Sequence, residues 1–142
     1  YIISLTLIND NIPDIWILYP LLISISSDIG GLLFGKIFKG KKLTKISPNK
    51  TISGSIGSFI FSLSLIPIFL NQLLDYSLLT IIFITIFTSL ASQLGDLFIS
   101  FLKRKTKIKN TGDILPGHGG FLDRVDGIIF ALPIGFMLFL IY

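Results

Sequence analysis

The amino-acid sequence predicts an all-α, polytopic integral membrane protein. Hydrophobic residues fill 51% of the 142 positions and charged residues only 14%, against about 25% charged residues in an ordinary soluble domain. The mean hydropathy is +0.83, and the apolar residues gather in segments close to the roughly 20 residues that a membrane-spanning helix needs. The chain has no cysteine, which excludes disulfides and thiolate metal sites. The lipid bilayer is therefore the expected surrounding of the chain.

Three full spans and two truncated spans are expected along the chain. The full spans are residues 15–38, 51–73 and 76–102. The opening residues 1–8 resemble the end of an earlier span, and residues 127–142 form a last span that ends at the terminus. The sequence contains no internal repeat and no linker. Residues 1–142 are thus expected to form a single transmembrane domain.

The positions of the basic residues predict how these spans are oriented. All 12 Lys and Arg residues lie in two windows, 36–50 and 103–124, whereas the connections at 9–14 and 71–75 carry only acids and amides. Cytoplasmic loops of membrane proteins hold the excess of Lys and Arg. Both basic windows are therefore predicted to be cytoplasmic loops, a separation that a soluble bundle of core helices would not require.

Two acids interrupt the predicted spans. Asp28 lies within residues 15–38 and Asp96 near the end of residues 76–102, each beside a glycine. A charge at mid-bilayer depth costs at least about 2.5–3.5 kcal/mol on insertion scales, so both acids need a cation or a water-filled cavity. At about 1.5 Å per residue, both lie about 11–12 Å inside the basic ends of their helices. They could line one polar cleft that opens to the cytoplasm; separate salt bridges to neighbouring helices are the alternative.

The first basic window contains a predicted helix start. Ser47 and Pro48 end one element, and Lys50 and Thr51 open the next. A helix start offers unpaired N–H groups and the positive end of the helix dipole, so a phosphate could bind there beside Lys50. Attraction of the lysines to lipid headgroups is the alternative explanation for this window.

The second basic window leads into a glycine-rich turn and two acids. The cations available to phosphate groups are Lys103, Arg104, Lys107 and Lys109, and the glycines are Gly117, Gly119 and Gly120. Asp123 and Asp126 are three positions apart and would share one face of a helix. Carboxylates beside phosphate-binding cations are the oxygen ligands that Mg²⁺ chemistry requires. His118, flanked by glycines and close to both acids, is a further candidate functional residue.

Both windows resemble the phosphatidate cytidylyltransferases (CDP-diacylglycerol synthases), and the likeness covers nearly the whole chain in order. The family signature is matched by Ser100, Lys103, Arg104, Lys109, Pro116, His118, Gly119, Gly120, Asp123, Arg124 and Asp126. A second family block is matched by Asp28, Gly35, Lys36, Ser47, Pro48, Lys50, Thr51, Gly54 and Gly57. Asn110 and Ser53 depart from the family pattern, which usually has an acid and a Glu or Gln there. Family members are longer, so this chain is expected to be the C-terminal part of the family fold, without its N-terminal spans.

The resemblance implies a reaction: the cytidylyl group of CTP is transferred to phosphatidic acid, which gives CDP-diacylglycerol and pyrophosphate. It implies a Mg²⁺ cofactor, with a two-metal site left open, held centrally by Asp96 and Asp123 and supported by Asp126 and Asp28. In the same interpretation, the triphosphate is held by Lys103, Arg104 and Arg124. Further substrate contacts are assigned to Ser47, Pro48, Lys50, Thr51, Lys36, Lys109, Gly119 and Gly120. His118 either donates a hydrogen bond to a phosphate oxygen or braces the glycine turn.

The expected partners are CTP, phosphatidic acid and the lipid bilayer, and a homo-oligomer is left open. Nucleic acid is not expected, because neither basic window interleaves the aromatic residues that stack on bases. The expected location is the inner membrane of a bacterium, with the active site facing the cytoplasm. The alternatives are a related cytidylyltransferase for another lipid phosphate, an inactive truncated homologue and, more remotely, a transporter that uses Asp28 and Asp96. A CDP-alcohol phosphotransferase would carry a denser run of acids than this chain has.

Overall fold

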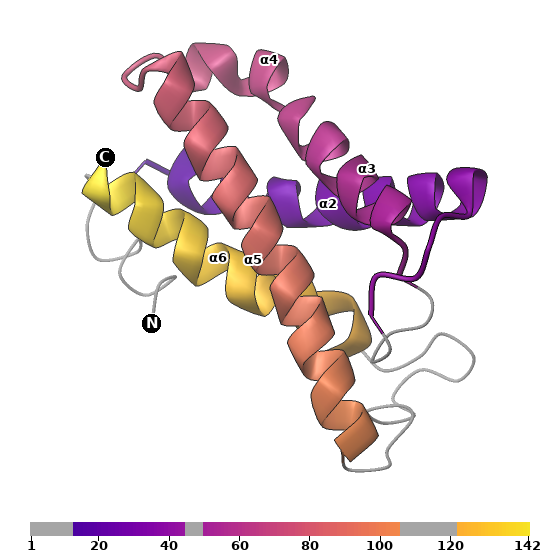
Figure 1. The fold of residues 1–142 in the computed structure, drawn as a ribbon. Coiled ribbons are helices and arrows are strands. Elements are labelled where there is room, and N and C mark those ends of the chain that lie inside the picture. Colours follow the sequence, from indigo (N-terminus) through magenta and orange to yellow (C-terminus); the bar gives the residue numbers. More distant parts are fainter. Residues whose placement is uncertain (1–12, 45–49, 106–121) are drawn as a thin grey trace.

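A computed structural model describes residues 13–44, 50–105 and 122–142 of the chain (Figure 1), with only the helical backbone described for 122–125. Within these ranges the secondary structure is helical and contains no strand, apart from one isolated antiparallel bridge between Lys42 and Thr51. The predicted all-α class is confirmed.

The described helices follow the predicted spans. They are α2 (Ile15–Phe38), α3 (Ile52–Leu63), α4 (Ile66–Phe69), the short 3₁₀ helix η1 (Leu70–Gln72), α5 (Leu78–Lys105) and α6 (Leu122–Ile141). Among the described residues, three helical stretches are long and apolar enough to cross a membrane: α2, the stretch Ile52–Gln72 and α5. The apolar part of α6, Asp126–Ile141, is shorter. The predicted helix end at residues 1–8 lies outside the described ranges, so the total number of spans stays a prediction.

The second predicted span, residues 51–73, is not one continuous helix. It breaks between α3 and α4, where Pro67 occupies the first turn of α4. Proline has no N–H to donate to the preceding turn, and its ring clashes with the carbonyl of residue i−4. The Ser64 hydroxyl donates a hydrogen bond to the Phe61 carbonyl just before the break. The apolar pattern therefore predicted the length of the span, whereas the proline sets the break inside it.

Helices α2 and α3 approach each other through glycine. A Cβ atom placed on Gly30 would lie 2.5 Å from the Gly57 carbonyl oxygen, and one placed on Gly57 would lie 2.7 Å from the Gly30 carbonyl oxygen. Small residues that allow backbones to approach this closely are typical of helix interfaces in membranes. On the other side of the bundle, α5 crosses α2, and α6 packs against both (Figure 1). This crossing places the middle of α2, the first turns of α3, the C-terminal half of α5 and the start of α6 around one space.

The interior of the bundle changes character along its length. Near the start of α2 it is apolar, and the cluster consists of Tyr19, Ile23, Ile66, Leu73, Ile81, Ile84 and Phe139. Further along α2 and α5, buried hydroxyls replace the hydrocarbon. Ser24 and Ser92 form a hydrogen bond of 2.8 Å, and Ser89 donates to Ser27 at 3.2 Å. Such hydrogen bonds hold membrane helices together where apolar contact gives no preference over lipid.

Candidate active site

A cleft of about 530 Å³ with charged and apolar lining residues lies where α2, α3, α5 and α6 meet, beside the basic end of α5. Its charged lining residues are Asp28, Lys50, Asp96, Lys103 and Asp126. Asp28 and Asp96 therefore line one shared cleft, as the sequence predicted. The structure also brings to it two lysines from the two separate basic windows.

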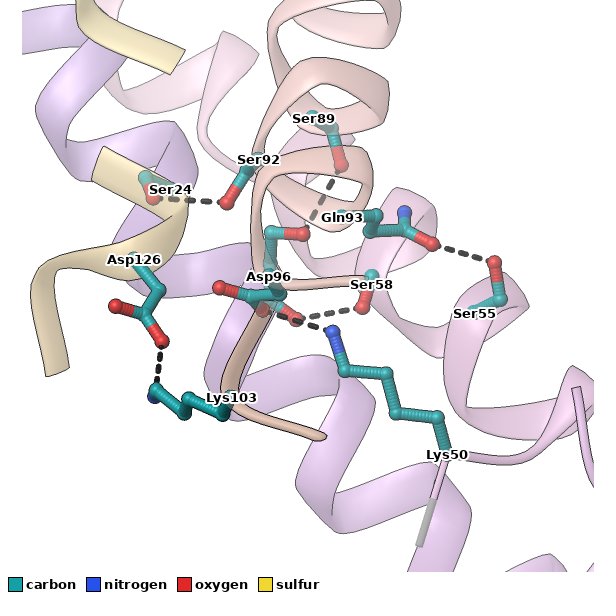
Figure 2. A network of polar contacts seen from close by, with 11 residues as sticks. Ser24, Lys50, Ser55, Ser58, Ser89, Ser92, Gln93, Asp96, Lys103 and Asp126 are labelled. Carbon is teal, nitrogen blue, oxygen red and sulfur yellow. Dashed lines mark hydrogen bonds and ion pairs between the residues drawn. The ribbon is translucent and has the colours of Figure 1, made fainter. Parts of the chain in front are cut away.

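Lys50 and Asp96 form the first ion pair of the cleft. The Lys50 Nζ lies 3.1 Å from the Asp96 Oδ2. Figure 2 shows the lysine extending from the start of α3 toward the acid on α5. The two side chains are 30% and 23% exposed, so the pair is reachable from the cleft. The lysine supplies the cation that an acid within a spanning helix requires.

Lys103 and Asp126 form the second ion pair. The Lys103 Nζ lies 2.8 Å from the Asp126 Oδ2, and the side chains are 16% and 7% exposed. The lysine belongs to the basic end of α5, and the acid lies in the N-terminal part of α6. This contact joins the two helices at the mouth of the cleft (Figure 2).

Asp28 completes a group of three acids. Its carboxyl group interacts electrostatically with that of Asp96, and the charges of Lys50 and Asp126 act on it as well. Two carboxylates this close repel each other unless a proton or a cation lies between them. The region around Asp28 and Asp96 is thus the part of the cleft where a cation would be stabilised most.

Close approach of α6 to this region depends on Gly127. A Cβ atom at this position would lie 2.5 Å from the Ser92 hydroxyl oxygen and 3.0 Å from the Asp96 Oδ1. Only glycine leaves both polar groups undisturbed. Its neighbour Asp126 is thereby held close to the acids of α2 and α5.

Two predicted substrate contacts lie elsewhere. Lys36 and Arg104 are exposed and do not line the described part of the cleft.

Thr51 lines the cleft, but its hydroxyl oxygen accepts a hydrogen bond from the Gly54 N–H as the cap of α3. The Ile52 N–H donates to the Lys41 carbonyl. These two N–H groups were expected to be open to phosphate and instead have partners within the chain, which leaves the Lys50 ammonium as the stronger anion-binding group there.

The remaining predicted site residues cannot be compared with the structure. Ser47, Pro48, Lys109, His118, Gly119 and Gly120 lie outside the described residues. Asp123 and Arg124 lie in the first turn of α6, and their side chains are likewise outside the described part. Within the described residues, no three His, Cys, Asp or Glu side chains are arranged to hold a metal ion. The metal-binding set stays a prediction, because it includes Asp123.

Ser55 and Gln93 form a polar contact in the cleft that was not predicted from the sequence. The Ser55 hydroxyl on α3 donates a hydrogen bond to the Gln93 Oε1 on α5 (Figure 2), and both residues line the cleft. A signal for Gln93 was present. It precedes Asp96 by three positions, so the two lie on neighbouring parts of one helix face. It also belongs to a series of polar residues in an apolar span, which typically faces the interior of a bundle.

The apolar helices and the charged cleft define an integral membrane protein whose charged site is shared by four of its helices. The model of the cytidylyltransferase family matches residues 2–142. The chain therefore belongs to the cytidylyltransferase family, and the predicted resemblance is confirmed.

Three similar proteins carry the name phosphatidate cytidylyltransferase. The one from Staphylococcus haemolyticus (strain JCSC1435) is 44% identical over 122 residues, which cover 84% of this chain and 46% of the relative. The one from Staphylococcus aureus (strain COL) is 45% identical over the same coverage. The one from Bacillus subtilis (strain 168) is 42% identical over 128 residues, which cover 89% of this chain and 47% of the relative. The chain thus spans about half the length of the curated relatives it matches.

Proposed function

We propose that this chain forms the catalytic membrane domain of a CTP:phosphatidate cytidylyltransferase. The family membership and the names of the relatives support this reaction. The observation that carries the proposal is the arrangement of the cleft, in which lysines from both basic windows face acids from three helices. A cleft of this kind suits reactants that are polyanions.

In the proposed reaction, an oxygen of the lipid phosphate attacks the α-phosphorus of CTP. A new P–O bond forms, the bond to the β-phosphate oxygen breaks, and pyrophosphate leaves. Both reactants are anions, so catalysis depends on positioning them and on neutralising their charge. Lys50 and Lys103 are the described groups that can do this. The lipid phosphate is already ionised and needs no general base.

We also propose that Asp28, Asp96 and Asp126, together with Asp123, hold Mg²⁺, with the number of ions left open. The donor chemistry fits, because carboxylate oxygens are the hard ligands that Mg²⁺ prefers and the charges of Asp28 and Asp96 act on each other. Asp123 would complete a ligand set that the described acids do not form by themselves. When bound, the ion would supply Lewis-acid neutralisation of phosphate charge. Asp96 would then serve as a ligand, and the Lys50 ammonium, which is paired with Asp96 in the structure, would be available to a phosphate.

The proposed location is the inner membrane of a bacterium, with the cleft open to the cytoplasm. The support is the position of the basic residues: the cleft lies beside the end of α5 that carries Lys103, Arg104 and Lys105. An excess of Lys and Arg is typical of the cytoplasmic side, which is also where CTP is available.

The reaction is tested with CTP labelled in its α-phosphate, incubated with the detergent-solubilised protein, phosphatidic acid and Mg²⁺. Label is expected in the lipid extract, whereas CTP labelled in its γ-phosphate should leave its label in the aqueous phase. Asp96→Asn should lower turnover by about 100-fold or more, because it removes an anionic oxygen ligand of the proposed Mg²⁺. The matched control is Asp75→Asn at an exposed acid between η1 and α5. The proposal fails if no α-label reaches the lipid, and Asp96 is removed from the site if its variant turns over normally at limiting Mg²⁺.

A further inference from the structure

Gln93 presents an unused hydrogen-bond donor in the cleft. Its Nε2 is buried and has no hydrogen-bond partner among the described residues. Its Oε1 accepts from Ser55, which fixes the orientation of the amide (Figure 2). A buried donor without a partner is unfavourable. A ligand that offers an acceptor oxygen at this point would therefore gain binding energy.

The amide lies deeper in the bundle than the ion pairs do. Along α5, Gln93 is three positions further from the basic end than Asp96, which corresponds to about 4.5 Å. Ser55 likewise follows Lys50 and Thr51 into the first turns of α3. The Gln93–Ser55 contact thus forms the deep side of the cleft, beyond the Lys50–Asp96 pair.

The cleft also has apolar lining residues. Ile25 and Ile29 of α2 line the same cleft and are 40% and 46% exposed. Among the described residues that line the cleft, none is aromatic, whereas nucleobases are typically held by stacking on aromatic rings. The deep side therefore suits hydrocarbon with an embedded acceptor better than it suits a cytosine ring.

We infer that the Gln93 side-chain NH₂ group binds an ester carbonyl of the lipid substrate, an inference that rests on the proposed function. In a diacyl phosphatidate the ester carbonyls lie on the acyl-chain side of the phosphate. A phosphate at the level of Lys50 would place a carbonyl oxygen toward Gln93, and the chains would continue past Ile25 and Ile29. Ether-linked lipids lack this carbonyl, so the amide selects for acyl esters.

The test compares diacyl phosphatidate with a dialkyl ether phosphatidate of equal chain length. The wild-type protein should prefer the diacyl lipid by about 5–10-fold in kcat/KM, the effect of one hydrogen bond. Gln93→Met keeps a side chain of similar length without the amide, and should bring this ratio close to one with the KM for CTP unchanged. Gln72→Met makes the same replacement at an exposed position in η1 and should keep the wild-type ratio.

A binding measurement accompanies turnover: thermal stabilisation of the protein by each lipid without CTP. If Gln93→Met does not fold, Ser55→Ala replaces it. Loss of the hydrogen bond from Ser55 to Gln93 should also lower the ratio of kcat/KM for the diacyl lipid to that for the dialkyl lipid. A wild-type ratio near one, or an equal loss for both lipids in the variant, overturns the inference. A change confined to CTP affinity would assign the amide to the nucleotide and overturn it as well. If the protein transfers the cytidylyl group but shows no ester preference, the proposed function stands and the inference about Gln93 fails. If it binds the ester lipid selectively but transfers no cytidylyl group, the inference stands and the proposed function fails.

Discussion

Replacing Gly127 with alanine should separate α6 from α5 at the cleft. The added Cβ would lie 2.5 Å from the Ser92 hydroxyl oxygen, whereas ordinary contacts of a Cβ begin at 3.4 Å. Either the Ser92 hydroxyl must rotate and lose its hydrogen bond with Ser24, or the two helices must separate by about 0.9 Å at this point. Asp126 is the preceding residue of α6 and would move with it, away from Asp96.

Two quantities should change in this variant. Overpacking of a tight interface lowers the free energy of unfolding by about 1–3 kcal/mol. Misplacement of reacting groups by about 1 Å lowers turnover by up to about 100-fold. Turnover is measured as transfer of α-label from CTP to lipid. Unfolding is followed by the fluorescence of the single tryptophan, Trp16, which stacks on Phe139 of α6.

Gly135→Ala is the matched control on the same helix. Its Cβ would lie 2.6 Å from Pro20, so it carries a similar packing cost. It lies eight residues beyond Gly127, about 12 Å along α6. The control should lose stability yet keep most of its turnover per folded molecule. Normal turnover in Gly127→Ala, or an equal loss in Gly135→Ala, would refute the claim that Gly127 positions the cleft.

Three further predictions concern orientation and anion binding. Because the chain has no cysteine of its own, single cysteines at Lys42 and Asn71 can be labelled with an impermeant thiol reagent; in intact cells only the one at Asn71 should react, and equal labelling would overturn the orientation. Lys50→Met should lower turnover by about 10-fold or more through loss of a charged hydrogen bond, whereas Lys41→Met at an exposed lysine should not; equal effects would remove Lys50 from the site. Arg124→Lys should lower kcat/KM for CTP with orientation intact, because lysine cannot form the bidentate contact; unchanged kcat/KM would assign Arg124 to topology.

Hydropathy predicted the helices better than it predicted their ends. The span at residues 15–38 coincides with α2, because polar residues flank the apolar run on both sides. Helix α5 continues to Lys105, past the predicted end at residue 102, since Lys and Arg are good helix formers although they end the apolar pattern. In the same way α6 begins at Leu122, ahead of the apolar span at residue 127, which agrees with the prediction that Asp123 and Asp126 lie on one helix. Hydropathy shows where the apolar part of a helix ends, whereas the helix itself continues into the polar residues beyond.

The site was predictable as a set of acids and cations, but its pairings were not. The depth of Asp28 and Asp96 could be counted along their helices, which is why their shared cleft was expected. Which lysine reaches which acid depends on the lateral fit of the helices, and this is set by close glycine contacts such as that of Gly127. The Ser55–Gln93 contact depends on the same fit. A single sequence shows which residues could form such contacts, but it does not show how the helices are aligned against one another.

The glycine contact between α2 and α3 also bears on how the protein is assembled. These helices are neighbours along the chain, so they can pair in the bilayer before α5 has been synthesised. In the structure the charge of Lys50, at the start of α3, acts on Asp28, so this lysine would be available to Asp28 at that stage. Asp96 arrives later with α5 and takes the lysine into its ion pair. The same ammonium group would thus accompany one acid during membrane insertion and a second one in the mature protein.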